Sequence, residues 1–145
     1  MSPEAERAAE VGEWLAKAAL DLRGARIDLA AQPALLEDAL FHCQQMVEKT
    51  LKAFLVWHDR SFRKTHSLEE IGRVCCEVDS ALTDLVDEAV PLTEYAWAFR
   101  YPGAPPIPTV GEAQAALNLA IRVAVAIAVR LPAVAVPEGF PRNPE

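Results

Sequence analysis

Residues 41–57 read FHCQQMVEKTLKAFLVW and residues 59–70 read DRSFRKTHSLEE, which together indicate an amphipathic helix followed by a short basic loop. In the first segment apolar residues recur every three or four positions, the period of a helix with one buried face. In the second segment Ser67 and Glu70 form the capping-box pattern that begins a further helix. The loop between the two helices carries Arg60, Arg63, Lys64 and His66.

The start of this further helix is a candidate phosphate site. The first backbone N–H groups of a helix lack intrahelical partners and carry partial positive charge, so they favour an anion. Arg63 and Lys64, with the N–H groups of Leu68 and Glu69, would supply the contacts. The formal net charge of the chain is −7, which argues against a broad basic face for a nucleic-acid duplex but allows a local phosphate site.

The rest of the chain is also patterned for helices. Hydrophobic residues make up 52% and charged residues 24% of the sequence, the balance of a globular protein. We predict an all-α antiparallel bundle of about five helices over residues 1–131, with a loosely ordered Pro-rich tail over residues 132–145. The expected helices cover residues 3–31, 34–58, 68–77, a fourth segment capped by Asp79 and interrupted at Pro91, and 110–131. Ser2 is the expected cap of the first of these helices, and Thr109 with Glu112 forms a capping-box pattern at the start of the last.

Polar and sulfur-bearing side chains in the second predicted helix suggest structural roles. Gln44, Glu48 and Lys52 fall largely off the apolar stripe, and Glu48 with Lys49 is interpreted as a solvated or dimer-facing pair. His42 has no His or carboxylate four residues later, so we expect a core or interface role. The sequence therefore predicts no metal site and no cofactor, and its three cysteines are expected to be buried reduced thiols.

The apolar run from Leu117 to Val136 contains Arg122, Arg130 and Pro132. These residues divide it into pieces shorter than the roughly 18 apolar residues that a membrane span requires. Acidic residues interrupt the N-terminus where a signal peptide would need an apolar segment. The expectation is a cytoplasmic protein without a membrane-spanning segment.

Three features in this order resemble the HEPN family (higher eukaryotes and prokaryotes nucleotide-binding domain). They are the segment FHCQQMVEKTLKAFL, the triplet Lys64-Thr65-His66 before a Leu-containing helix, and the segment over residues 100–103, RYPG. The resemblance covers roughly residues 11–129. It implies a helical bundle, commonly a homodimer, often paired with a small nucleotidyltransferase in toxin–antitoxin systems whose HEPN member is a metal-independent ribonuclease.

Nuclease members of the family use an Arg, four to six other residues and a His, in a loop well after the second helix. The corresponding loop here begins at Arg100, and no His follows it in the chain. Arg60 and His66 have the required spacing, but in an earlier loop. His66 would accept the proton of an RNA 2′-hydroxyl, and Arg60 or Lys64 would stabilise the charged phosphorane.

Other interpretations stay open at this stage. His66 and Thr65 would fix the entry of the next helix through hydrogen bonds, and the loop would bind phosphate without cleavage. Arg100 and Tyr101 would bind a phosphate and stack on a base, or would only anchor a loop. Three functions remain: a nucleotide- or RNA-binding HEPN protein with a nucleotidyltransferase partner, a ribonuclease toxin, and a non-catalytic scaffold.

Overall fold

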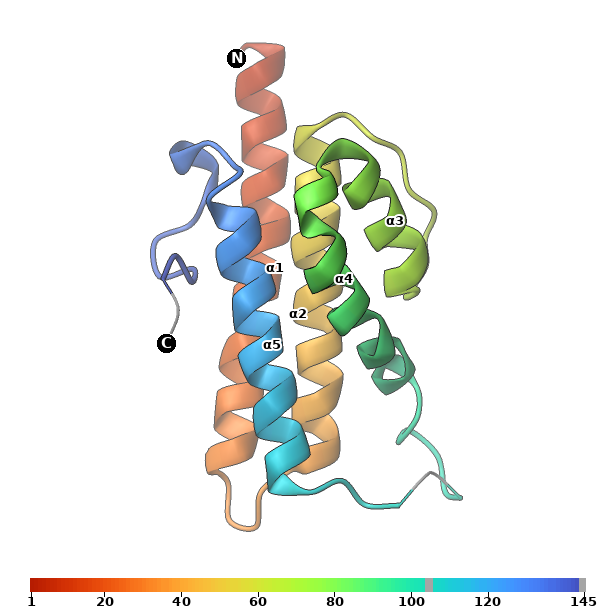
Figure 1. The fold of residues 1–145 in the computed structure, drawn as a ribbon. Coiled ribbons are helices and arrows are strands. Elements are labelled where there is room, and N and C mark those ends of the chain that lie inside the picture. Colours follow the sequence, from red (N-terminus) through yellow and green to blue (C-terminus); the bar gives the residue numbers. More distant parts are fainter. Residues whose placement is uncertain (104–105, 144–145) are drawn as a thin grey trace.

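The computed structural model describes residues 1–103 and 106–143, and all regular elements within these ranges are helical (Figure 1). The all-α bundle predicted from the sequence is confirmed. The elements are α1 (Pro3–Ala30), α2 (Leu36–Trp57), α3 (Leu68–Val78), η1 (Ser80–Leu82), α4 (Thr83–Ala89), η2 (Val90–Ala96), α5 (Val110–Ala128) and η3 (Ala133–Ala135).

Helix α2 is the centre of the bundle. It packs along α1 and against α5, α3 and η2, so that most of its surface is covered (Figure 1). Leu40, Val47 and Phe54 lie on its apolar stripe and are at most 1% exposed. Burial of each such side chain stabilises the fold by about 1.5–3 kcal/mol. Functional side chains carried by α2 are therefore held on a rigid element.

The predicted helix starts are confirmed by their capping bonds. Ser2 Oγ accepts from the N–H of Ala5 at 3.1 Å, and Ser67 Oγ accepts from that of Glu70 at 3.2 Å. Thr109 Oγ1 accepts from the N–H of Glu112 at 3.0 Å. The fourth predicted helix divides into η1, α4 and η2, and Pro91, which has no N–H to donate, lies in the first turn of η2.

Helices α3 and α4 approach closely at Gly72. A Cβ atom at this position would clash with Cγ1 of Val86. The absence of a side chain at Gly72 is therefore what allows α4 to pack on α3, which fixes the position of the helix that follows the basic loop.

The prediction of a loosely ordered C-terminal tail is wrong for the described part of that tail. Ala135, Val136 and Phe140 are buried, and η3 contacts α1. The guanidinium of Arg142 donates to the carbonyl of Val136 at 2.9 Å. The prolines prevent a regular helix here, but the apolar residues between them still dock on α1.

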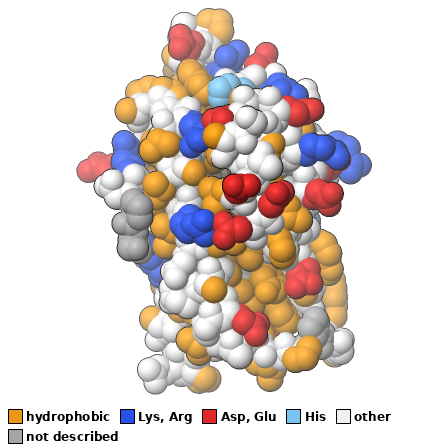
Figure 2. Space-filling view, viewed as in Figure 1, with side chains coloured by type: hydrophobic (Ala, Val, Ile, Leu, Met, Phe, Trp, Pro, Cys, Tyr) orange, Lys and Arg blue, Asp and Glu red, His pale blue; other side chains and the backbone are white. Residues whose placement is uncertain are grey.

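Helix α5 is 19 residues long, and by length and composition it could cross a membrane, contrary to the sequence argument that the run is too short. Core helices of soluble proteins share this length and composition. Here α5 packs against α2, and Ala120, Ala124 and Ile127 are fully buried. Its exposed positions include the polar residues Gln114, Asn118 and Arg122. On the face of the molecule drawn in Figure 2, most of the charged side chains lie over the upper half.

Candidate phosphate site at the start of α3

The basic loop runs from the end of α2 to the start of α3 and places several cations near the first turn of α3. The guanidinium of Arg63 donates to both carboxylate oxygens of Glu70, at 2.8 and 3.2 Å. This pairing lowers the pKa of the Glu70 carboxyl and raises that of Arg63. Lys64 is exposed, and Arg73 lines the same hollow as Arg63 and Thr65. Glu70 thus neutralises part of the positive charge that Arg63 and Arg73 bring to this hollow.

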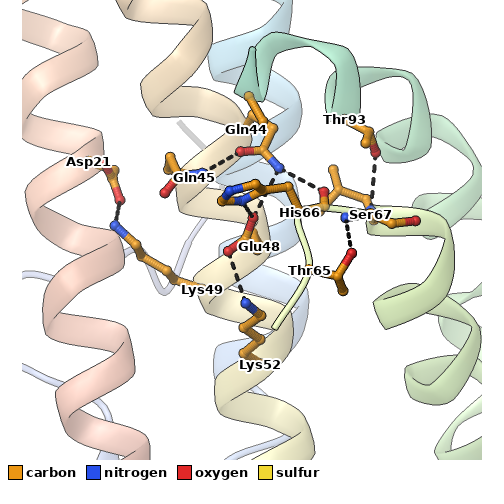
Figure 3. Close-up of polar contacts among 12 residues, drawn as sticks. Asp21, Gln44, Gln45, Glu48, Lys49, Lys52, Thr65, His66, Ser67 and Thr93 are labelled. Atoms are coloured by element: carbon orange, nitrogen blue, oxygen red, sulfur yellow. Dashed lines mark hydrogen bonds and ion pairs between the residues drawn. The ribbon is translucent and has the colours of Figure 1, made fainter. Parts of the chain in front are cut away.

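His66 is held by a buried carboxylate of α2. Its Nδ1 lies 2.7 Å from Oε1 of Glu48, while the His66 side chain is 59% exposed and that of Glu48 only 5% exposed (Figure 3). A neutral imidazole that donates from Nδ1 keeps its lone pair on Nε2. Glu48 therefore orients the ring and selects the tautomer, as a carboxylate does for a catalytic or metal-binding histidine.

Glu48 belongs to a network of buried polar side chains on one face of α2 (Figure 3). Its Oε2 accepts from Lys52 Nζ at 3.0 Å, and its Oε1 also accepts from Gln44 Nε2 at 3.2 Å. Gln44 Nε2 in addition donates to the backbone carbonyl of His66 at 3.1 Å. Gln44 Oε1 accepts from Gln45 Nε2 at 2.6 Å. The interpretation of Glu48 as a solvated or dimer-facing residue is wrong.

The polar face of α2 is buried because the basic loop and α1 cover it. Lys52 Nζ lies 5.6 Å from the ring centroids of both Trp14 and Phe62, on α1 and in the loop. The Trp14 and Phe62 rings contact each other edge to face at 6.0 Å. Contacts with two aromatic rings and a carboxylate stabilise the Lys52 ammonium group away from water. The loop is thus anchored at Phe62, ahead of His66.

The N-terminus of α3 differs in one respect from the predicted anion site. The N–H of Leu68 donates to Oγ1 of Thr93 at 3.1 Å, so it is not available to an anion, and that part of the prediction is wrong. Thr65 Oγ1 accepts from the N–H of Ser67 at 3.0 Å, which confirms the helix-entry role expected for Thr65. Side-chain cations, more than backbone N–H groups, therefore define the site.

Arg60 lies away from His66. Its guanidinium donates to Oε2 of Glu77 at 2.9 Å, in the last turn of α3, whereas His66 directly precedes the first turn. The ten residues from Ser67 to Glu77 span about 15 Å at 1.5 Å per residue. Arg60 is therefore paired at the opposite end of α3 from His66, so the predicted catalytic pair is not assembled, whereas Arg63 and Lys64 precede His66 in the same loop.

Arg100 and Tyr101 are at a separate surface. The Arg100 guanidinium stacks 4.9 Å from the ring centroid of Phe41 and donates to the carbonyl of Ala96 at 3.4 Å. It lines a hollow with Tyr95 and Phe99, whose rings stack on each other at 5.9 Å. Tyr101 is 76% exposed. These contacts fit a loop anchor at Arg100 and leave Tyr101 accessible to a ligand.

His42 occupies an acidic cluster that sequence reasoning missed. Its Nδ1 lies 2.8 Å from Oδ1 of Asp21, and its Nε2 lies 3.3 Å from Oδ2 of Asp38, four residues earlier on α2. The expectation that His42 lacks a carboxylate partner considered only the following turn and is wrong. Burial, with the neighbouring Asp38, raises the pKa of Asp28 to about 6.

Three side chains of the candidate phosphate site were not identified from the sequence: Gln44, Glu48 and Arg73. The sequence contained one signal for the first two, since residues 44, 48 and 52 recur at four-residue spacing on one helix face. Nothing in the sequence indicated that this face would be covered. Arg73 lies in the second turn of α3 and lines a hollow with residues of the loop only because of the tertiary fold.

The fold and site define a class: a small helical bundle whose central helix carries a buried polar network beneath a basic loop. The chain belongs to the HEPN domain family, whose model matches residues 11–128, and the suspected family is thereby confirmed. Searches of curated proteins and of solved structures returned no match.

Proposed function

We propose that this HEPN protein binds phosphate groups of a nucleotide or RNA at the basic loop. The observation that carries the proposal is the exposed His66 ring, fixed by buried Glu48 in the loop that also carries the exposed cations Arg63 and Lys64. An oriented imidazole and flexible cationic side chains together suit a phosphate with an adjacent ribose or base. The site is small, as expected for an acidic chain that binds a few phosphates.

The first test measures binding of a short single-stranded RNA as salt is varied. Arg63→Ala with Lys64→Ala should weaken binding and flatten the salt dependence, because fewer counterions are released. Glu70→Gln should strengthen binding, since it frees the Arg63 guanidinium and removes a negative charge. Arg122→Ala is the matched control, because Arg122 is an exposed arginine paired with Glu88 of α4. Equal affinity of the parent, the double variant, Glu70→Gln and Arg122→Ala for RNA would contradict the proposal.

Assembly with other chains is part of the same proposal. Family membership supports a nucleotidyltransferase partner in a toxin–antitoxin-like pair, and a homodimer of this chain. The exposed apolar side chains Leu20 and Ile27 are seven residues apart on α1, hence on one face, and offer a surface for such contacts. Co-purification of this chain with a nucleotidyltransferase encoded beside it tests the heteromeric pairing.

Metal-independent RNA cleavage is the second candidate function, and the Glu48–His66 contact is the observation that favours it. A carboxylate-oriented imidazole with a basic Nε2 can remove the proton of a 2′-hydroxyl, whose oxygen then attacks the adjacent phosphorus. The bond from phosphorus to the 5′-oxygen breaks, this oxygen takes a proton from water, and the other product carries a 2′,3′-cyclic phosphate. Lys64 is the nearest exposed cation in sequence for stabilising the developing charge.

Cleavage is tested with labelled RNA in excess EDTA. Activity that depends on this site should survive EDTA, leave the cyclic phosphate and fall about a hundredfold or more in His66→Ala, the usual scale for loss of a general base. His58→Ala is the control, because His58 is also exposed and close to the loop but contacts the Phe54 ring. RNA binding without cleavage would leave only the binding function.

A further inference from the structure

We propose that Asp28, Asp38 and His42 form a binding site for a divalent transition-metal cation, with Zn²⁺ preferred over Mg²⁺. One ligand atom from each of the three residues lies within 4.8 Å of the other two, a spacing that a single coordinated ion can bridge. This site is independent of the basic loop. His42 and Glu48 are six residues apart on α2, about 9 Å along the helix.

The first argument is a buried carboxylate oxygen without a partner. Asp28 is 6% exposed, and among the described residues its Oδ2 has no hydrogen-bond partner. A buried carboxylate oxygen without a hydrogen-bond partner carries a desolvation cost. A cation bound between Asp28 and its two neighbours would remove that cost.

The second argument is the orientation of the His42 ring. Asp21 Oδ1 lies 2.8 Å from Nδ1, and Lys49 Nζ fixes the other oxygen of Asp21 at 2.7 Å. A ring that donates from Nδ1 to Asp21 presents its Nε2 lone pair to Asp38 Oδ2, 3.3 Å away. Two acceptors this close require a proton or a cation between them. A carboxylate behind a metal-binding histidine is the usual support of such ligands.

The third argument is the local packing around the imidazole. Gly24 of α1 faces the ring, and a Cβ atom there would lie 2.9 Å from Nε2 of His42. The glycine leaves room for the ring in this orientation. The Asp38 side chain is 57% exposed and lines the hollow that contains Arg100, so an ion can enter from solvent.

The donor set selects the metal. One imidazole nitrogen with two carboxylate oxygens suits Zn²⁺ and its first-row neighbours, whereas Mg²⁺ prefers an all-oxygen octahedron. Three protein ligands leave a fourth position of a tetrahedral site for water. Of the three aspartates near His42, Asp21 is paired with Lys49, which leaves the carboxylates of Asp28 and Asp38 to favour a cation.

The test is calorimetric titration of the EDTA-treated, dialysed full chain with ZnCl₂ and separately with MgCl₂. Zn²⁺ should bind the parent at one ion per chain, and at least tenfold more weakly to Asp28→Asn and to His42→Gln. Asp21→Asn, which removes the residue behind the histidine, should weaken binding ten- to a hundredfold. Glu37→Gln, an exposed carboxylate outside the cluster, should bind like the parent.

Two further readouts separate a metal site from an internal ion-pair cluster. Zn²⁺ should raise the thermal midpoint of the parent but not that of Asp28→Asn, whose metal-free midpoint should be no lower than the parent's. Co²⁺ should give visible absorption without a thiolate charge-transfer band, because no cysteine is a ligand. No Zn²⁺ binding, equal binding in Asp28→Asn and parent, tighter binding of Mg²⁺ than of Zn²⁺, or a thiolate band would each overturn the proposal.

Discussion

The Nδ1 atom of His66 lies 2.7 Å from Oε1 of Glu48, so an exposed imidazole in a loop is tied to a buried carboxylate in the central helix. The two residues are 18 positions apart and belong to different elements. Glu48 is held in turn by Lys52, whose side chain is 8% exposed. The position of the loop therefore depends on the charge balance inside the bundle.

Glu48→Gln should destabilise the protein by about 3–5 kcal/mol, because it leaves the Lys52 ammonium buried without its counter-charge. Urea unfolding followed by circular dichroism measures the change. Glu88→Gln is the control: it breaks the Glu88–Arg122 pair, whose side chains are more than half exposed, and should lower the stability far less than Glu48→Gln does. Equal losses in the two variants would show that the Glu48–Lys52 pair contributes no more than a surface pair.

His66→Ala should change stability much less than Glu48→Gln, by at most about 1.5 kcal/mol, since it removes one hydrogen bond from a half-exposed ring. The same urea measurement applies. A loss as large as that of Glu48→Gln would assign His66 a mainly structural role and would weaken the case for a functional imidazole at this position.

Gly72→Ala should destabilise the bundle by about 1–3 kcal/mol, because the new Cβ would clash with Cγ1 of Val86 and push α4 from α3. Gly111→Ala is the matched control within a helix. Its new Cβ would have no atom closer than 3.8 Å, so alanine should be neutral or stabilising by up to about 1 kcal/mol. Thermal unfolding of both variants checks the difference, and a neutral Gly72→Ala would refute the close approach.

The three cysteines should differ in reactivity at pH 8. Burial, with contributions from Asp21 and Asp28, raises the pKa of the Cys43 thiol to about 12, and burial with Cys76 raises that of Cys75 to about 12. Since only the thiolate reacts, raised pKa values suppress reaction at pH 8. Cys76 is only partly buried and should react first. Mass spectrometry after brief iodoacetamide treatment should find one modified residue, and modification of Cys43 before unfolding would contradict the structure.

A homodimer of this chain should depend on the exposed face of α1. Leu20→Glu with Ile27→Glu should convert a dimer to a monomer without lowering the thermal midpoint, since both side chains are 58% exposed. Light scattering at tens of micromolar measures the mass. A monomeric parent protein would contradict the proposed homodimer. A double variant that is still dimeric would show that the interface lies on another surface.

Local sequence determined most of the secondary structure. Ser2, Ser67 and Thr109 cap their helices as their spacing to the following residues predicted, because capping involves neighbours within one turn. Family and fold class also followed from the sequence, through the period of the apolar residues and the order of three short segments. The prediction of a loosely ordered tail was wrong, because prolines restrict the local backbone but do not determine whether a side chain such as Phe140 is buried.

Tertiary structure alone decided the chemistry of both sites. Helical spacing puts Gln44, Glu48 and Lys52 on one face of α2. Only the docking of the loop and of Trp14 buries that face and brings His66 within hydrogen-bond distance of Glu48. Likewise, only the packing of α1 on α2 brings Asp21 and Asp28 to His42. Sequence periodicity fixes the direction of a side chain on its own helix, whereas its burial and its partners depend on which other element covers it.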